Sequence, residues 1–250
     1  MLSKTKAKYI QSLNHKKVRE EEQVFIAEGQ KVVLEFLSSG DTTCLMLIVT
    51  KACLANIDPN ILNKVGELIL AESFEIKKVS QLANAPDILG IFSQKEITAP
   101  VLSGKLSIML DGIRDPGNLG TIIRIADWFA IENIICSKDT VDCYNSKVVQ
   151  ASMGSLLRLN IWYTDIESYI LANNTISVYA ATLEGQDVYT IGSITEGILV
   201  IGNESAGIRE NILGLIDKRV SIPRSGKAES LNAAVACGIL LSSLTKAQVR

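Results

Sequence analysis

A regular alternation of short apolar runs with segments of helical periodicity organises the second half of the chain. The apolar runs have the length and composition of buried strands. We expect strands at 106–110, 131–136, 159–163, 177–181, 197–201 and 219–222. Helices are expected at 118–129, 146–153, 166–171, 207–216 and from Ser230 to about Leu244. This alternation predicts an α/β fold with a mostly parallel, doubly wound sheet.

The first part of the chain predicts a smaller α/β domain. After a first helix around residues 9–13, strands are expected at 24–27, 44–49, 74–79 and 88–92, and helices at 28–37, 59–70 and 80–84. The segment 94–104 then breaks the pattern with Pro100, Gly104 and mixed polarity. We therefore divide the sequence into a domain at 1–97, a linker at 98–105 and a second domain at 106–250.

The composition excludes several classes of protein. No apolar run approaches the length that spans a bilayer, and the charged start has no apolar segment of a secretory signal after it. We expect a cytoplasmic protein without a membrane partner. The five cysteines are scattered and form no CxxC pair, which favours free thiols over disulfides or a zinc site, so no metal is expected.

The charge is unevenly distributed, although the net charge is only −2. Residues 1–19 carry lysines and an arginine but no acid, and Glu20, Glu21 and Glu22 follow at once. This stretch is either a basic patch that meets RNA phosphates or the solvated end of an amphipathic helix. The only histidine, His15, lies there, so an enzyme of this sequence would work without histidine chemistry.

Three polar loops that contain glycine each lie between an expected strand and an expected helix. They are residues 115–124, 202–207 and 223–232. In open parallel sheets, ligands bind at the carboxyl ends of the strands, so the three loops can converge on one crevice. A GxGxxG fingerprint is absent, which disfavours a nucleotide-dependent oxidoreductase. Ala228 stands where a P-loop needs Ser or Thr for magnesium, so a P-loop is rejected.

The same loops contain motifs that resemble a known family. These are Asn118-x-Gly120-x-x-x-Arg124, Gly202-Asn-Glu-x-x-Gly207, and Ile222-Pro-x-x-Gly226-x-x-x-Ser230-Leu-Asn232. In order, spacing and flanking strands they resemble the three motifs of the SpoU family, which are S-adenosylmethionine-dependent RNA ribose 2′-O-methyltransferases of the SPOUT class. The resemblance covers roughly residues 106–245. Residues 24–33 also resemble the family's RNA substrate-binding domain, over a shorter stretch.

This resemblance implies a fold, a cofactor and a set of site residues. The second domain would carry a deep C-terminal trefoil knot, form a homodimer and bind S-adenosylmethionine within the knot. The residues that match the family's catalytic constellation are Arg124, Glu204, Ser230, Asn232 and Asn118. Those that match its cofactor pocket are Thr182, Leu183, Gly202, Ile222 and Leu231.

For two arginines, Arg124 and Arg224, our expectation differs from the family pattern. In the family the arginine at position 124 is also proposed to accept the proton of the ribose hydroxyl, which is difficult for a group whose pKa is above ~12. We expect Arg124 to grip a phosphate and stabilise the nascent alkoxide, with Glu204 orienting Arg124 or neighbouring donors. Arg224 stands where relatives usually carry an apolar residue, and it either shapes the cofactor pocket or points to the surface.

The expected function is 2′-O-methylation of a ribose in structured RNA. Ribosomal RNA, and 23S RNA in particular, is favoured over transfer RNA because of the N-terminal domain, and no DNA partner is expected. A non-catalytic RNA-binding or ribosome-assembly factor that keeps the fold is the rival. It would bind RNA without affinity for the cofactor.

Overall fold

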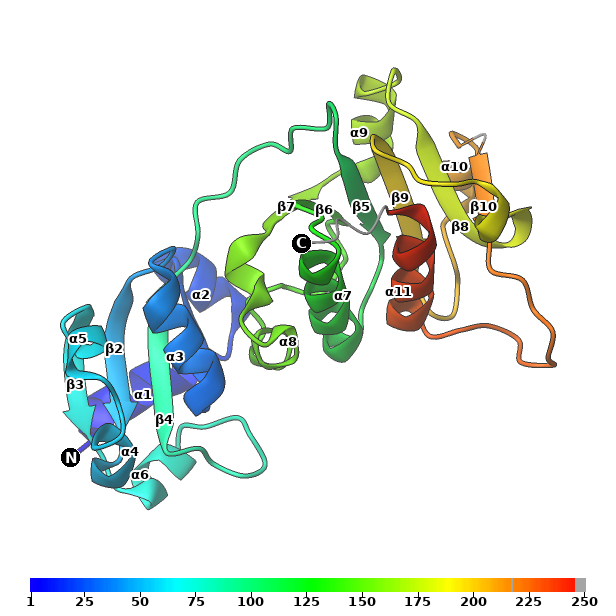
Figure 1. Ribbon diagram of the computed structural model, residues 1–250. Helices are drawn as coiled ribbons and strands as arrows, with labels where there is room; N and C mark the ends of the chain where they lie inside the picture. The colour runs from blue at the N-terminus through cyan, green and yellow to red at the C-terminus, as the bar shows by residue number, and fades with distance from the viewer. Residues whose placement is uncertain (217, 246–250) are drawn as a thin grey trace. The chain divides into compact units, whose positions relative to one another are not determined.

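The structure is a computed structural model that describes residues 1–216 and 218–245 (Figure 1). The chain forms two compact units. The first comprises Met1–Glu96 and Asp142–Leu157, and the second comprises Ile97–Val141 and the described chain from Arg158 onward. These units differ from the predicted domains in one segment, since 142–157 was assigned to the second domain. This segment packs on the first unit because the Tyr144 ring lies 4.9 Å from that of Phe25 and Asp142 pairs with the buried Arg19.

A four-stranded mixed sheet forms the centre of the first unit, in the order β1-β4-β2-β3. The strands are β1 (Val24–Glu28), β2 (Cys44–Val49), β3 (Val65–Leu70) and β4 (Ile88–Ser93). The helices are α1 (Lys4–Ser12), α2 (Lys16–Glu22), α3 (Gln30–Ser39), α4 (Lys51–Leu54), α5 (Pro59–Leu62), α6 (Ser73–Lys77) and α8 (Ser146–Ser152). Successive strand residues face opposite sides, so α1 packs through Ile10 on one face and α3 through Phe36 on the other.

Three expectations for the first unit were wrong. The predicted helix 59–70 ends at Leu62, and its second half is β3, which pairs with β2 in parallel. The approach of the two backbones is close, since a Cβ on Gly66 would lie 2.9 Å from a β2 carbonyl oxygen. The predicted strand 74–79 is α6, which begins with a capping box formed by Glu72 and Glu75. The predicted helix 80–84 is a loop.

A six-stranded sheet forms the centre of the second unit, and all its neighbouring strands run parallel, as predicted. The order is β10-β8-β9-β5-β6-β7. The strands are β5 (Leu106–Asp111), β6 (Asn133–Ser137), β7 (Asn160–Thr164), β8 (Val178–Asp187), β9 (Gly197–Gly202) and β10 (Lys218–Ser221). The helices are α7 (Pro116–Trp128), α9 (Ile166–Ala172), α10 (Glu210–Leu213) and α11 (Ala233–Leu244), with short turns η1 (Ser155–Arg158), at the junction of the two units, and η2 (Val188–Thr190).

Helices cover both faces of this sheet. On one face, Ile166 and Ile170 of α9 and Ile212 of α10 form a core with strand residues such as Met109. On the other face, α7 and α11 lie side by side (Figure 1). Because β5 and β6 are buried along their whole length, the sheet is the rigid frame from which the motif loops emerge.

No helix in the described part of the chain is long and apolar enough to cross a membrane.

Candidate active site at the carboxyl edge of the parallel sheet

The three motif loops leave the carboxyl edge of the second unit's sheet. The first follows β5 and the second follows β9, and these two strands are neighbours whose last residues, Asp111 and Gly202, are paired in register. The third loop follows β10, on the far side of β8. The parallel direction of all these strands is the reason that segments distant in sequence emerge at one edge.

A chain of two hydrogen bonds joins the three motifs. The Asn118 Nδ2 atom donates to Glu204 Oε1 at 2.7 Å, and the Asn232 Nδ2 atom donates to Asn118 Oδ1 at 2.8 Å. The bonded residues are 86 and 114 positions apart in the sequence. Three of the five residues expected to form the catalytic constellation are therefore in direct contact.

Capping interactions hold the two asparagines of this chain in place. Pro116 begins α7, and Asp115 accepts the Asn118 backbone N–H at 2.8 Å, which fixes Asn118 in the first turn. Asn232 caps α11 itself, since its Oδ1 atom accepts the N–H groups of Ala234 and Val235 at 3.0 and 3.3 Å. The helix expected from Ser230 begins three residues later, at Ala233.

The hydrogen-bond chain has a fixed direction. An ionised Glu204 can only accept, so the Asn118 amide must turn its Nδ2 atom toward Glu204 and its Oδ1 atom toward Asn232. Asn232 must then donate with its own Nδ2 atom, which leaves its Oδ1 atom for the helix cap. One carboxylate thus determines the orientation of two amides and the start of a helix.

Arg124 and Ser230 lie outside this chain. Both side chains are exposed, and within residues 1–216 and 218–245 neither makes a hydrogen bond or ion pair. Arg124 follows Asn118 by six residues, which turns it about 240° around the axis of α7. Glu204 therefore bonds a neighbouring amide donor and does not hold Arg124.

Four of the residues expected to bind the cofactor lie on or directly after three adjacent strands, and the fifth, Leu231, lies in the loop before α11. Thr182 follows the Ala180–Val200 pair by two residues on β8, as Gly202 does on β9, and Ile222 follows the last residue of β10. Arg219 of β10 pairs with Ala180 of β8, and the next residue, Val220, pairs with Gln186. Residues 181–185 therefore bulge out of β8. The bulge contains Leu183, which is largely exposed.

Two of these residues offer exposed apolar surface to an aromatic ring. Leu183 and Leu231 are 72% and 47% exposed. A Cβ on Gly202 would lie 2.3 Å from the backbone of Gly207 and of Ile208, so only glycine fits this crossing of the chain. Arg224 donates to the carbonyl of Ala228 at 3.1 Å and closes its own loop, which places it outside this set.

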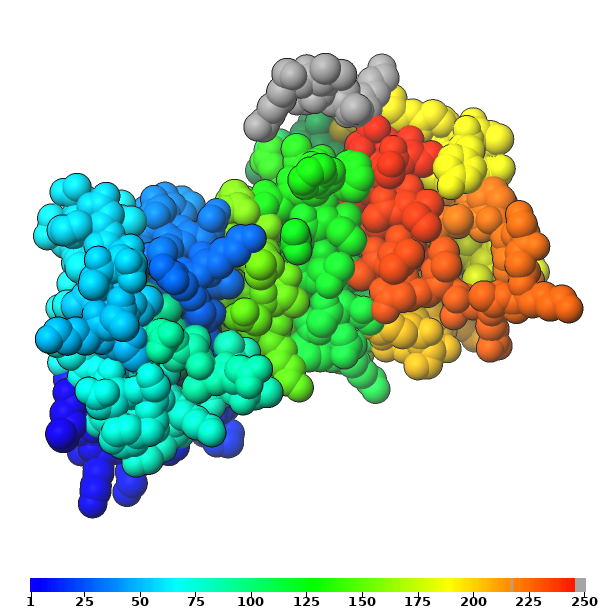
Figure 2. Space-filling model, turned by 60° about the horizontal axis from the view of Figure 1, so that its bottom comes forward, coloured from blue at the N-terminus to red at the C-terminus, as the bar shows by residue number. Residues whose placement is uncertain are grey.

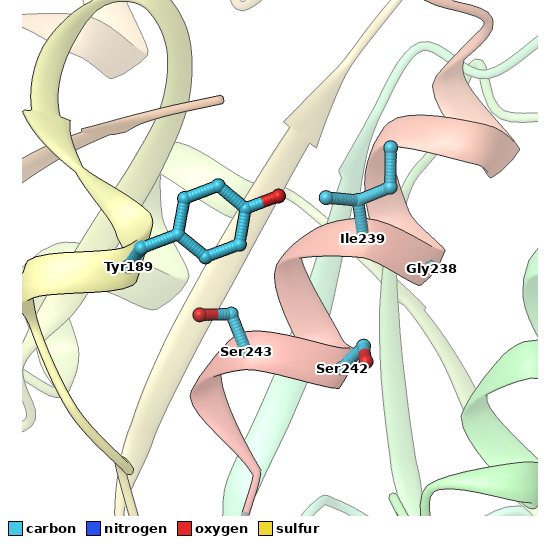
Figure 3. Close-up of a pocket in the computed structure, with 5 residues that line it drawn as sticks. All are labelled: Tyr189, Gly238, Ile239, Ser242 and Ser243. Atoms are coloured by element: carbon cyan, nitrogen blue, oxygen red, sulfur yellow. The ribbon is translucent and has the colours of Figure 1, made fainter. Parts of the chain in front are cut away.

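A separate hollow of about 480 Å³ lies against the C-terminal half of α11 (Figure 3). It is lined by Tyr189, Gly238, Ile239, Ser242 and Ser243, and the Tyr189 hydroxyl points toward Ile239. None of the predicted site residues lines it. Among the described residues, no three His, Cys, Asp or Glu side chains are grouped to hold a metal ion.

Three lysines of the basic N-terminal stretch pair with acidic side chains of the first unit. Lys6 pairs with Glu67, Lys16 lies 3.5 Å from Glu20, and Lys17 lies 3.8 Å from Glu21. The helical i,i+4 pairs favour a solvated helix surface over a free basic patch for these lysines. His15 precedes α2 and makes no capping hydrogen bond with its side chain.

The sequence motifs do not include Asp111 and Arg209, which form an ion pair between the end of β5 and the end of the loop that carries Glu204. The signal that could have found Asp111 is a charged residue at the end of an otherwise apolar, buried strand. Nothing in the sequence pointed to Arg209 as its partner, because the two are 98 residues apart.

Comparison with known proteins identifies the family of this chain. The profile of the SpoU rRNA methylase family matches residues 105–242, and that of the MRM3-like substrate binding domain matches residues 4–90. The 23S rRNA (guanosine(2553)-2′-O)-methyltransferase RlmP of Bacillus subtilis is 27% identical over 242 residues, which cover 96% of this chain and 95% of that protein.

Two solved structures resemble the whole chain. A protein assigned to the TrmH family of RNA methyltransferases from Porphyromonas gingivalis has a TM-score of 0.86 at 37% identity, with 98% of each chain covered. The AdoMet-bound rRNA methyltransferase of Sinorhizobium meliloti has a TM-score of 0.85 at 31% identity, with 97% of this chain and 95% of that chain covered. The three motifs, the parallel sheet and these relatives show that the chain belongs to the SpoU rRNA methylase family and is an RNA methyltransferase, as the sequence predicted.

Proposed function

We propose that this protein transfers the methyl group of S-adenosylmethionine to the 2′-hydroxyl of a ribose in 23S ribosomal RNA. The hydrogen-bond chain from Glu204 through Asn118 to Asn232 is the observation that carries this proposal, because it assembles the three motifs into one site. The name of the Bacillus relative and the AdoMet complex of the Sinorhizobium protein support the substrate and the cofactor.

The site residues divide into those that hold the cofactor and those that align the ribose. Thr182, Leu183, Gly202, Ile222 and Leu231 would hold S-adenosylmethionine, whose sulfonium supplies an electrophilic methyl group. Transfer to the ribose oxygen is an in-line displacement that depends on alignment. Asn118, Glu204, Ser230 and Asn232 would set this alignment through the amides and the start of α11.

Arg124 would bind the phosphate next to the reactive ribose. Its side chain is exposed and unpaired among the described residues, and a planar guanidinium matches two phosphate oxygens. The same positive charge stabilises the ribose oxygen as it loses its proton. A lysine would keep the charge but lose the two-pronged contact.

The finer features of the family fold belong to the same proposal. A trefoil knot in the C-terminal part is supported by family membership. A homodimer is supported by exposed apolar side chains on α7 and α11, which lie beside each other at the surface (Figure 2). Trp128 is 84% exposed and Val235 is 50% exposed. Sedimentation equilibrium of the purified protein tests the dimer.

The domain at 1–97, joined to the methyltransferase domain at 106–250 by the linker 98–105, would bind the RNA. The match of residues 4–90 to a substrate binding domain supports this role. The bacterial relative that methylates 23S rRNA supports a cytoplasmic location. Transfer RNA is the alternative substrate, and the size of the labelled RNA distinguishes the two.

Transfer of a labelled methyl group to total RNA from cells that lack the enzyme tests the function. We expect label in 23S RNA, mapped to a ribose, and a loss of at least about 100-fold in rate for Arg124→Ala, with an intermediate loss for Arg124→Lys. Arg219→Ala removes an exposed arginine from the edge strand β10 and serves as the matched control. No labelled RNA, naked or in precursor particles, together with no binding of S-adenosylmethionine would support a non-catalytic RNA-binding role instead.

A further inference from the structure

A buried aspartate ends the central strand of the second unit. Asp111 is 1% exposed, and its Oδ2 atom accepts the backbone N–H of Arg209 at 2.8 Å. Its Oδ1 atom forms an ion pair with Arg209 Nη2, 2.5 Å away, and this pair balances the charge of the carboxylate. A buried carboxylate without a partner is costly, so Asp111 requires Arg209 to stay where it is.

Arg209 is oriented mainly by Asp111. The Asp111 carboxylate raises the pKa of the guanidinium, and Asp139 and Asp165 contribute from the ends of the next two strands. The second carboxylate, Asp139, lies 3.6 Å from Arg209 Nη2 but is half-exposed, and it also faces Arg114 at 3.8 Å. The buried partner therefore dominates the position of Arg209.

The loop that carries Glu204 is attached to the end of β5 at both of its ends. At its start, Asn203 Nδ2 donates to the carbonyl of Gly112 at 2.7 Å, and Asn203 Oδ1 accepts the N–H groups of Ser205 and Ala206 at 3.0 and 3.2 Å. Asn203 and Gly207 also exchange two backbone hydrogen bonds of 2.9 Å. At its end, Arg209 is held by Asp111.

Both attachment points lie on the segment from which α7 departs. Asp111 and Gly112 directly precede the loop that leads to Asn118, so the loop of Glu204 and the helix of Asn118 share one anchor. We propose that Asp111, through its ion pair with Arg209, is a positioning residue for methyl transfer that sets the Glu204–Asn118 contact. This inference rests on the proposed function, since it concerns the alignment that the reaction needs.

Stability alone does not require this ion pair. Buried ion pairs can be replaced by apolar side chains without loss of stability, so a charged residue at the end of β5 is more readily explained by a need for one loop conformation. Asp111→Asn keeps an oxygen that can accept the Arg209 N–H, but it removes the charge that holds the guanidinium. We expect the loop to remain folded and to lose its fixed position relative to α7.

Two measurements on the full-length protein test the positioning role of Asp111. Hydrogen–deuterium exchange of the Ser205 and Ala206 amides should be faster in Asp111→Asn than in the wild type and unchanged in the control Asp139→Asn. With S-adenosylmethionine and 23S RNA, Asp111→Asn should lower kcat by about 10-fold to 100-fold, as expected for small misplacements of aligned groups, with little change in KM for RNA. In a Glu204→Gln background the same substitution should have a much smaller effect on kcat.

The outcomes distinguish failure of the positioning role from failure of the proposed function. Unchanged exchange in the loop, or kcat losses for Asp111→Asn and Glu204→Gln that simply multiply, would overturn the positioning role. If the wild type methylates no RNA, the proposed function fails, and the role of Asp111 in methyl transfer fails with it. Exchange can still show in that case that Asp111 holds the loop that carries Glu204. Should Asp111→Asn not fold, Arg209→Lys replaces it in both measurements with the same expectations, because it keeps a positive charge beside Asp111 and loses the planar guanidinium.

Discussion

Replacing Asn118 by aspartate reverses one link of the hydrogen-bond chain at the site. The new carboxylate oxygen would stand in the place of Nδ2, 2.7 Å from Glu204 Oε1, where a donor is needed. The contact to Asn232 would survive, because that residue donates and either oxygen of an aspartate accepts. The substitution therefore changes one contact without changing the shape of the side chain.

The expected cost follows from this contact. A hydrogen bond to a charged acceptor contributes about 1.5–3 kcal/mol, and its loss is the first part. Two like charges about 4 Å apart repel by about 1 kcal/mol in water and about 4 kcal/mol at the effective dielectric of a protein surface. Asn118 and Glu204 are both partly solvent-accessible, so the repulsion lies near the lower value. We expect Asn118→Asp to reduce the free energy of unfolding by about 2–4 kcal/mol.

Adding Glu204→Gln should repair the damage. The amide that this second substitution introduces can donate to the new carboxylate, Asn232 still donates to its other oxygen, and the net charge equals that of the wild type. We expect the double variant to regain most of the lost stability, with a coupling energy of about 2 kcal/mol. We also expect methyl transfer to recover in part, because the chain contributes geometry. In acid, protonation of one carboxyl group should reduce the defect of the single variant.

Denaturant unfolding followed by tryptophan fluorescence measures these values. Both tryptophans, Trp128 and Trp162, lie in the second unit, so the signal reports the unit that contains the site. Asn56→Ala, which removes an exposed asparagine that bonds the Ala52 carbonyl in the first unit, is the control and should leave this signal unchanged. Unfolding of Asn118→Asp at the denaturant concentration of the wild type, or a further loss on adding Glu204→Gln, would refute the reasoning.

Other predictions test the frame around the site. Gly202→Ala should destabilise the second unit by at least about 1–3 kcal/mol and weaken binding of S-adenosylmethionine in calorimetry, because its Cβ would lie 2.3 Å from backbone atoms; unchanged binding would contradict this. The native thiols should not react with Ellman's reagent at pH 8, since all five cysteines are buried and burial raises the pKa of Cys44 and Cys237 to about 12, whereas all should react in denaturant. Stability should fall as the pH drops below about 4, because hydrogen bonds from the Ser137 hydroxyl and the Ser168 N–H lower the pKa of Asp139 and Asp165, so folding favours their ionised forms. An acid limb in thermal unfolding that is the same in Asp139→Asn and the wild type would count against a contribution from Asp139.

Local pattern was sufficient for the second unit's sheet and insufficient for the edge of the first. The strands of the parallel sheet are buried on both faces, so each appears as a continuous apolar run, and their expected positions agree with the structure to within a few residues at most ends. The strand β3 is half-exposed and follows a proline-initiated turn, so its apolar residues suggested one long helix. In the folded chain these residues form a strand because they pair with β2, which is 16 or more residues away in the sequence.

The motifs named the residues of the site, and the tertiary structure decided their contacts. Asn118, Glu204 and Asn232 could be selected from the sequence because their residue types recur at family spacing. That Glu204 bonds the amide of Asn118 while Arg124 stays free depends on the turn of α7 and on the pairing of β5 with β9. The ion pair of Asp111 with Arg209 is of the same kind, since its members are 98 residues apart and neither lies at a periodic position that points to the other. Periodicity is a local property of the chain and predicts elements, whereas hydrogen bonds between loops arise only when parallel strands place those loops at one edge of the sheet.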